Sequence, residues 1–457
     1  MSLITQGMKG TQDLLPANSA AWQFTENTLS DLAINYGFRE IRTPVFEHTE
    51  LFQRSVGDTT DVVQKEMYTF NDKGGRSITL RPEGTAGAVR AFLEHGLFNE
   101  PSPMKVYYHT SCYRYEKPQA GRLREFHQFG VECFGSDNPA QDAEIISLAS
   151  DIFFTFGIDD LELQLNSIGC PKCRPSYQQA LKEYFSAHVD ELCEDCKGRL
   201  DRNPMRIVDC KCEGCAALAK NAPVITDYLC DECNDHFELV KKYLNGMDIP
   251  FTVNPKIVRG LDYYTKTVFE FVSHNIGAQG TILGGGRYDG LCDELGGRHV
   301  PALGFAMGME RLMLLFEAEG VELPKYDNPA IYIAPVGEDA YIKAADIAHE
   351  LRLSGIEARF DTMGKSIRAQ MKYANKIGAA FSVVIGDDEI NNGIVKVKQM
   401  DTGNEYAIYL ENFSEDFLDL YIDKSTVGLT EALEGMMTGI DWNNVDLSEL
   451  IGGEING

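Results

Sequence analysis

The sequence predicts an α+β protein of about three domains, the last of which alternates strands with helices. The chain has 457 residues, of which 44% are hydrophobic, enough for several buried cores. Most of its 12 cysteines fall between Cys170 and Cys233, which marks a distinct insert. The segment after residue 329 alternates predicted strands and helices, a pattern typical of an α/β domain with a mixed or parallel sheet. The strands are expected at 330–336, 356–360 and 381–386, and the helices at 339–354 and 366–377.

The composition restricts the functional class. A net charge of -27 argues against non-specific nucleic-acid binding, but local basic stripes can still hold a specific RNA once salt screens distant charge. No apolar run approaches the ~18 residues needed to cross a bilayer, and the first residues lack the apolar core of a signal peptide. We therefore expect a cytoplasmic protein with no membrane partner. In that compartment cysteines indicate metal ligands or free thiols more than disulfides.

The N-terminal part begins with a loop, followed by a predicted helix over 19–36 and a strand over 38–46 that is interrupted by Pro44. A proline cannot donate to a β-ladder, so this strand is expected at a sheet edge or a subunit interface. A strand at 77–80 then leads into a helix that ends near His95. Between them, Glu83 and Thr85 offer acceptors for a ligand at a bend, although they would serve equally well as helix caps.

A polar loop with strands on both sides forms the strongest cluster of candidate site residues. The strands are predicted at about 105–116 and 126–135, and Arg114, Gln128 and Glu132 lie on them near the loop. Their side chains can converge on one pocket. The alternative is a charged surface hairpin, but that would bury Glu132 among aromatic residues without a partner.

Two further segments combine glycines with an arginine and tyrosines. Residues 258–271 read VRGLDYYTKTVFEF, in which the second half alternates as a strand does and Gly260 permits a bend beside Arg259. Residues 281–291 read TILGGGRYDGL. Arginine binds phosphate or carboxylate bidentately, whereas the alternative is an ordinary half-buried strand with a surface arginine.

These segments resemble the signature motifs of the histidyl-tRNA synthetases, a family of class II aminoacyl-tRNA synthetases. The resemblance covers about residues 5–423. It rests on LRPEGTAG at 80–87, the hairpin at 113–135, RGLDYY at 259–264, GGRYDGL at 285–291, and ALGFAMGMERLMLLF at 302–316. It implies a six-stranded antiparallel catalytic sheet with flanking helices, a helical insert and an α/β anticodon-binding domain. The implied domains are a catalytic domain at 1–169 and 251–325, the insert at 170–250, the anticodon-binding domain at 329–424 and an acidic tail at 425–457.

The resemblance also implies an activity and site residues. The protein would use ATP with Mg²⁺ to join L-histidine to tRNA(His), and would work as a homodimer. Arg114 and Arg259 would hold the α-phosphate and the substrate carboxylate, and Arg311 would contact the outer phosphates. Histidine would be bound by Glu83, Thr85, Gln128, Glu132, Tyr263, Tyr264 and Tyr288. The tRNA acceptor end would meet Arg122 and Arg124.

The spacing of the cysteines is typical of a metal-binding site. Pairs of the form C-x-x-C each supply two ligands from one tight turn, and two pairs complete a four-thiolate zinc site. The candidate ligands are Cys170, Cys173, Cys193, Cys196, Cys210, Cys215, Cys230 and Cys233. The spacing predicts one or two structural zinc ions without saying which pairs share an ion. Free thiols are the alternative, because the corresponding insert of the family generally does without a metal.

A basic stripe is expected on the predicted helix at 366–377. Arg368, Lys372 and Lys376 recur every four residues, while Ile367, Met371 and Ala374 would face the sheet. Ser366 is a good N-cap and Gly378 a good helix end. Most such stripes only face solvent; here the resemblance suggests contact with the anticodon arm.

Two other classes of protein remain as alternatives. A non-catalytic regulatory paralogue of an ATP phosphoribosyltransferase shares the catalytic fold, but typically lacks the C-terminal domain and the motif arginines that this chain has. A zinc-dependent RNA-binding protein built on the insert would leave the other motifs unexplained.

Overall fold

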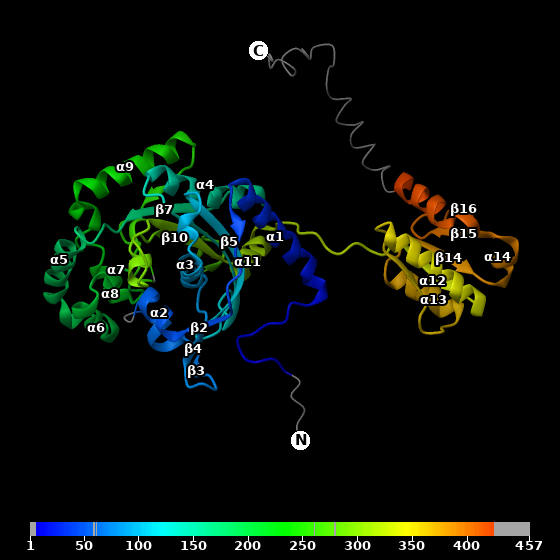
Figure 1. Ribbon diagram of the computed structural model, residues 1–457, viewed down its shortest axis with the longest axis horizontal. Coiled ribbons are helices and arrows are strands. Elements are labelled where there is room, and N and C mark those ends of the chain that lie inside the picture. Colours follow the sequence, from blue (N-terminus) through cyan, green and yellow to red (C-terminus); the bar gives the residue numbers. More distant parts are fainter. Residues whose placement is uncertain (1–5, 58–59, 61, 260, 278–279, 425–457) are drawn as a thin grey trace, which may run out of the picture. The chain divides into compact units, whose positions relative to one another are not determined.

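The computed structural model describes residues 6–57, 60, 62–259, 261–277 and 280–424. Gly260 and the acidic tail at 425–457 lie outside these residues. The chain forms two compact units, Met1–Lys325 and Tyr326–Gly457 (Figure 1). The finer domain limits at residues 170 and 250 stay a prediction. Within the described residues, no helix combines the length and the apolar character needed to cross a membrane.

The first unit is built on a large sheet, in which eight strands are found among the described residues. The six central strands pair antiparallel throughout, as expected, and a short strand adds to each edge in parallel. In spatial order they are β1 (Arg39–Glu40), β5 (Met104–Tyr113), β6 (Glu125–Phe134), β11 (Ala302–Gly308), β10 (Thr281–Arg287), β9 (Thr265–Val272), β7 (Glu162–Ser167) and β8 (Thr252–Val253).

The main core lies between this sheet and the helices that cover it. These helices are α1 (Pro16–Asn35), α4 (Pro139–Thr155), α9 (Asp231–Gly246) and α11 (Met309–Glu319). Each contributes apolar side chains that are fully buried with those of the strands, such as Leu29, Leu148, Val240 and Leu312. Burial of this apolar surface, at about 25 cal/mol per Å², stabilises the sheet that carries the candidate site residues.

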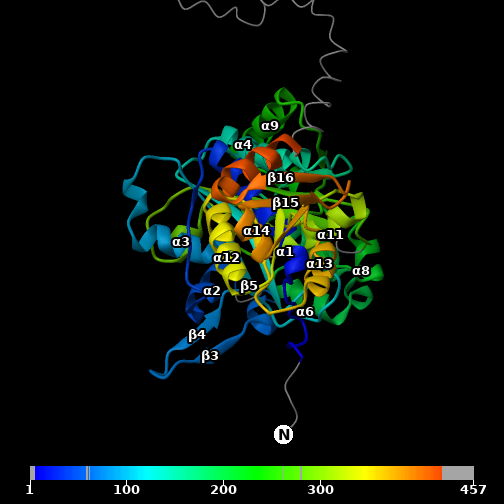
Figure 2. The same cartoon turned by 90° about the vertical axis from the view of Figure 1, so that its right-hand side faces the viewer.

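The predicted strand over 38–46 is interrupted at Pro44, as expected, but its two parts do not belong to one sheet. The chain there forms two short strands in different sheets: β1, and β2 (Phe46–His48), which pairs with β4 (Ser77–Leu80). Pro44 lies between them, where it has no ladder bond to donate. A small sheet of β2, β4 and β3 (Thr69–Asn71) results, and Figure 2 shows β3 and β4 projecting from the body of the unit. Helices α2 (Thr49–Val56), α3 (Thr85–Glu94) and α10 (Leu291–Glu294) lie in the same unit.

The cysteine-rich insert is helical, as predicted. Its short helices group at one end of the first unit (Figure 1). They are α5 (Arg174–Ser186), α6 (Glu194–Arg202), α7 (Met205–Val208) and α8 (Glu213–Leu218), and α9 follows them. Phe185 and Ile207 of the insert share one buried cluster with Tyr263 and Tyr264 of the signature segment. The insert therefore packs directly against residues of the candidate site.

The second unit has a mixed sheet flanked by helices. The strands lie in the order β13 (Ala358–Phe360), β12 (Ile331–Pro335), β14 (Phe381–Ile385), β15 (Ile394–Gln399) and β16 (Glu405–Tyr409), and the helices are α12 (Glu338–Leu353), α13 (Ile367–Lys376) and α14 (Asp387–Asn392). The first three strands are parallel, and the unpredicted hairpin of β15 and β16 adds antiparallel.

Helix α13 differs from the prediction in two details. Ile367 is exposed, whereas Gln370 is buried and donates to the Pro335 and Lys365 carbonyls. The buried side of the helix is therefore Gln370, Met371 and Ala374. Ser366 occupies the N-cap position without a side-chain capping bond, and Gly378 ends the helix with a φ of 67°.

Candidate active site

A cavity of about 410 Å³ opens on the central sheet of the first unit. Side chains from β6, β10, β11, the start of α11, the hairpin loop, the segment before β9 and the start of α3 converge on it. Most of the residues predicted to bind histidine or ATP line this cavity, and so does Arg122: the others are Glu83, Thr85, Arg114, Gln128, Arg259, Tyr263, Tyr264 and Arg311. Arg206 of the insert also lines it and was not predicted. Five arginines, one of them from the insert, thus surround one space that Glu66, Glu83, Glu116 and Glu310 also line, and the excess of positive charge favours an anionic ligand.

Arg259 crosses the face of the sheet to form an ion pair with Glu270 on β9, which the sequence analysis did not foresee. A Cβ at Gly284 of β10 would overlap the Arg259 guanidinium, so the glycine run makes room for this side chain. Burial by itself would lower the pKa of Arg259, but Glu270 and Tyr264 raise it, so the guanidinium remains charged. Its buried Nε has no hydrogen-bond partner among the described residues.

Two other arginines are held in place by backbone carbonyls. Arg114 Nε donates to the Pro82 carbonyl at 2.9 Å, and its guanidinium lies over the Phe126 ring. Arg311, on α11, donates to the Thr281 carbonyl at 2.7 Å. Burial lowers the pKa of Arg311, and the nearby guanidinium of Arg122 lowers it further. Like charges held this close repel one another until an anion binds between them.

Glu83 caps a helix and also lines the cavity. Its carboxylate accepts hydrogen bonds from the Thr85 and Ala86 amides at 2.7 and 2.9 Å, which caps the N-terminus of α3. The same side chain lines the cavity. Burial raises the pKa of Glu83, although these amide bonds act in the opposite direction. The helix cap therefore holds a carboxylate at the cavity wall.

Glu132 lies behind the cavity wall, with both oxygens bonded to tyrosines. Tyr108 donates to Oε1 at 3.0 Å and Tyr288 donates to Oε2. Tyr108 was missed by the sequence analysis. The hairpin register could have indicated Tyr108, because it pairs this residue with Gly130. A Cβ at Gly130 would overlap the tyrosine ring, so the glycine makes room for it. Burial raises the pKa of Glu132 to about 8, although the hydroxyl donors lower it.

We expect the Glu132→Gln variant to lose less thermal stability than the wild type as the pH rises from about 5 to about 8.5. The pKa of Glu132 is about 8 in the folded protein and 4.5 ordinarily. The stability that this proton contributes is complete below the lower value and is lost as the pH rises through the higher one. Glutamine has no proton to lose.

The measurement is the melting temperature of both proteins across this pH range, with the exposed Glu415→Gln as a matched control. Parallel curves for wild type and Glu132→Gln would contradict the raised pKa of Glu132.

Arg287, in the second signature segment, has a structural position. It is fully buried and forms ion pairs with Asp142 of α4 and with Asp289. His236 of α9 also contacts Asp142, at 3.1 Å. Burial alone would raise the pKa of Asp142, but Arg287 and His236 lower it to about 2. This network ties β10 to the two helices behind the sheet.

The remaining predicted residues are not among those that line the cavity. Arg124 stacks on the Tyr115 ring at 4.0 Å in the hairpin loop. Arg368, Lys372 and Lys376 are all exposed on α13 in the second unit. The eight predicted cysteine ligands gather in two groups of four, in the insert and at its two ends.

The comparisons with known proteins agree with this geometry. A family model described as histidyl-tRNA synthetase matches residues 10–312, and one described as an anticodon binding domain matches residues 330–420. Histidine–tRNA ligase of Caldanaerobacter subterraneus subsp. tengcongensis is 54% identical over 90% of this chain and 99% of its own length. That of Clostridium novyi is 54% identical over 90% and 98%.

A solved structure, apo histidyl-tRNA synthetase of S. aureus, superposes with a TM-score of 0.78. It is 41% identical and covers 91% of this chain and 100% of its own. An ATP phosphoribosyltransferase regulatory subunit/histidyl-tRNA synthetase from Bacillus halodurans C is 20% identical and shares the fold alone. Two matched domains in order, together with relatives of this identity over nearly their whole length, establish the relationship. The chain belongs to the histidyl-tRNA synthetase family.

Proposed function

We propose that this protein joins L-histidine to tRNA(His) in two steps, through a histidyl-adenylate, with release of AMP and diphosphate. The observation that carries the proposal is the cavity in which Arg114, Arg259 and Arg311 face Glu83 and Gln128. The first step needs cations for two anionic reactants, and a carboxylate and an amide for the substrate amino group. The names of the two relatives described above support the same reaction.

In the first step the histidine carboxylate attacks the α-phosphorus of ATP. Both reactants are anions, so they must be neutralised and aligned before they meet. Arg114 and Arg259 hold the α-phosphate and the carboxylate, and Arg311 holds the outer phosphates. When the substrates bind, the Arg259 guanidinium replaces part of its ion pair with Glu270 by hydrogen bonds to the substrates. Its unpartnered Nε supports this role.

Mg²⁺ accompanies ATP and, when bound, neutralises charge on the outer phosphates. The residues present fit this ion, because Glu116 and Glu310 line the same cavity and offer the oxygen ligands that Mg²⁺ prefers. Glu310 is oriented by the backbone N–H and ring Nδ1 of His127, at 3.0 and 2.8 Å. Glu116 is paired with Arg122 at 3.0 Å.

Histidine selectivity rests on the far end of the cavity. Glu83, Thr85 and Gln128 orient the amino group, while Tyr263 and Tyr264 enclose the imidazole. Glu132 and Tyr288 lie behind these two tyrosines. Glu132 binds a ring nitrogen of the substrate in place of one of its two hydrogen bonds from tyrosine hydroxyls. An analogue without ring nitrogens offers Glu132 no replacement for that bond, which costs up to ~10⁴-fold in specificity.

The deciding experiment is amino-acid-dependent exchange of pyrophosphate into ATP by the purified protein. We expect exchange with histidine and none above background with phenylalanine or glutamine, followed by charging of tRNA(His). A folded protein that binds histidine but catalyses no exchange would instead indicate the regulatory paralogue.

We also propose a homodimer. Val45 and Phe46, which follow Pro44, are 41% and 54% exposed, and Phe24 and Ile34 of α1 are also exposed. Exposed large apolar side chains in these two segments favour a protein partner. Light scattering should give twice 50.9 kDa; a monomer at micromolar concentration would contradict the proposal.

The basic stripe of α13 is proposed to contact phosphates of the anticodon arm. Changing Arg368, Lys372 and Lys376 together to alanine should weaken tRNA binding and flatten its salt dependence. The expected change is up to about one unit of slope per lost contact. Exchange of pyrophosphate, which needs no tRNA, should be unchanged. The measurement is KM for tRNA across a salt series.

A matched control is the triple change of Lys343, Lys396 and Lys398 to alanine, which removes equal charge elsewhere in the same unit. If both triple variants respond alike to salt, the stripe has no specific contact.

A further inference from the structure

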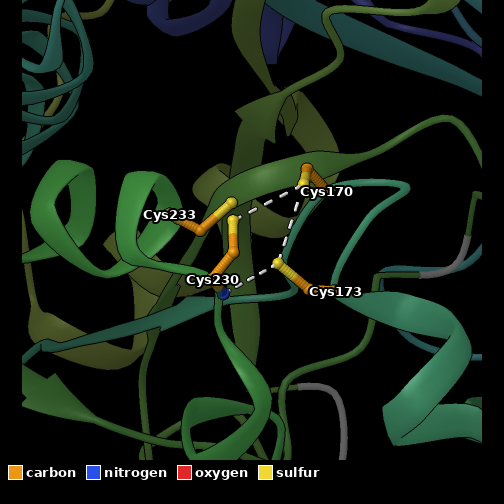
Figure 3. Close-up of side chains that lie close together, drawn as sticks. All are labelled: Cys170, Cys173, Cys230 and Cys233. Carbon is orange, nitrogen blue, oxygen red and sulfur yellow. Dashed lines mark hydrogen bonds between the residues drawn. The ribbon is translucent and has the colours of Figure 1, made fainter.

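Eight cysteines of the insert form two groups of four, and the pairing is nested. Cys170 and Cys173 meet Cys230 and Cys233, which come from the other end of the insert. Cys193 and Cys196 meet Cys210 and Cys215 inside that interval. Figure 3 shows the four side chains of the outer group pointing toward one another. Each group combines two chain segments, so the fold and not the spacing selects the partners.

The sulfur positions match a single tetrahedral ion. Four thiolates about 2.3 Å from Zn²⁺ lie at the corners of a tetrahedron whose edge is about 3.8 Å. The Cys170 sulfur lies 3.6 Å from that of Cys173 and 3.9 Å from that of Cys230. In the inner group, Cys193 and Cys210 are 3.9 Å apart. All sulfurs of each group lie within 4.8 Å of one another.

Disulfides and polynuclear clusters fit less well. A disulfide needs its sulfurs about 2.05 Å apart, and all 12 cysteines are free thiols here. An iron–sulfur cluster places several irons and sulfides between its thiolates, which separates them further than this geometry allows. Four thiolates around one ion are the ligand set of structural zinc.

Backbone amides point at the sulfurs. Cys230 N donates to Cys173 Sγ at 3.1 Å, Cys193 N to Cys215 Sγ at 3.3 Å, and Cys212 N to Cys210 Sγ at 3.5 Å. Cys173, Cys193 and Cys230 occupy the N-cap positions of α5, α6 and α9. Four thiolates around a divalent cation leave a net negative charge, which such amides and helix N-termini stabilise.

We propose that the insert binds two Zn²⁺ ions, an outer one held by Cys170, Cys173, Cys230 and Cys233, and an inner one held by Cys193, Cys196, Cys210 and Cys215. Cys212 is exposed and belongs to neither group. The inner ion joins α6 to α8, helices of 9 and 6 residues, which are too short to be stable alone.

The two ions also brace residues beside the cavity. Arg174, next to the outer group, donates to the Tyr264 carbonyl. Asn203 and Arg206 lie between the inner pairs, and donate to Asp262 at 3.2 Å and to the Arg259 carbonyl at 2.8 Å. Loss of either ion is therefore expected to lower the melting temperature.

The first test is the metal content of the full-length protein after dialysis against EDTA. We expect two zinc ions per chain and no iron, with X-ray absorption at the zinc edge giving four sulfur neighbours at about 2.3 Å. One ion per chain, bound iron, or a metal-free protein with an unchanged melting temperature would each overturn the proposal. These measurements use the wild type and need no assay of activity.

The second test resolves the pairing. The double variant Cys170→Ser/Cys230→Ser should retain one zinc per chain, because both changes fall in the outer group, whereas Cys170→Ser/Cys210→Ser should retain none. The control Cys212→Ser should retain two. Equal zinc loss in the two double variants would overturn the nested pairing. If a double variant fails to fold, Co²⁺ titration of the double variants Cys173→Ser/Cys233→Ser and Cys173→Ser/Cys215→Ser decides, with one tetrathiolate absorption band of half intensity expected in the first and none in the second.

Discussion

Replacing Arg259 with alanine should reduce histidine-dependent pyrophosphate exchange by at least ~10²–10³-fold, about 3–4 kcal/mol of transition-state stabilisation. The guanidinium faces the cavity from a position fixed by Glu270 and by the insert, so it needs little rearrangement when the reactants meet. Removing it leaves two anions to approach with less neutralisation. The kinetic constants for ATP and histidine, measured by exchange, provide the test.

The variant leaves Glu270 without its ion pair, so folding must be monitored as well. The double variant Arg259→Ala/Glu270→Gln removes that unpaired charge and serves as the control for stability. We expect it to melt near the wild type and to remain inactive. Near-normal exchange by a folded Arg259→Ala protein would remove this residue from the proposed mechanism.

Replacing Gly284 with alanine is expected to lower kcat/KM for exchange by ~10²-fold, because a displacement of about 1 Å in a catalytic group has a cost of this size. The added Cβ would overlap the far end of the Arg259 side chain, which can move, and meets no backbone atom among its nearest neighbours. The fold should therefore survive while the guanidinium leaves its place. Circular dichroism melting and exchange kinetics measure the two effects separately.

Gly290 provides the matched control, since a Cβ there would meet nothing within 4 Å. Gly290→Ala should behave as the wild type. If Gly284→Ala is also fully active, the position of Arg259 against β10 does not matter for the reaction.

Local patterns predicted the elements that carry the strongest motifs. The alternation and turn residues of the hairpin predicted β5 and β6 to within a few residues, and the motif order predicted the antiparallel sheet. The hairpin of β15 and β16 was missed, although Val395 and Val397 alternate with exposed lysines, as in a strand with one face buried and the other in solvent. That the strand interrupted by Pro44 divides between two sheets was not predicted, because a local pattern cannot tell which sheet a segment joins.

At the candidate site, the sequence predicted the types of residue, whereas the fold decided their contacts. Glycines and arginines at fixed spacing indicated which residues bind anions, because those types suit phosphate and carboxylate whatever the fold. The pairing of Arg259 with Glu270 depends on how the segment before β9 turns back across the sheet. The position of Glu132 behind two tyrosines depends on strand register.

By itself, the sequence determined the family, the types of residue at the site and the presence of cysteine pairs, since each follows from short-range spacing. Only the tertiary structure decided which side chains meet. Cys170 and Cys230 are 60 positions apart and their sulfurs are 3.9 Å apart. Such contacts arise from the packing of whole helices and strands, and no local pattern encodes that packing.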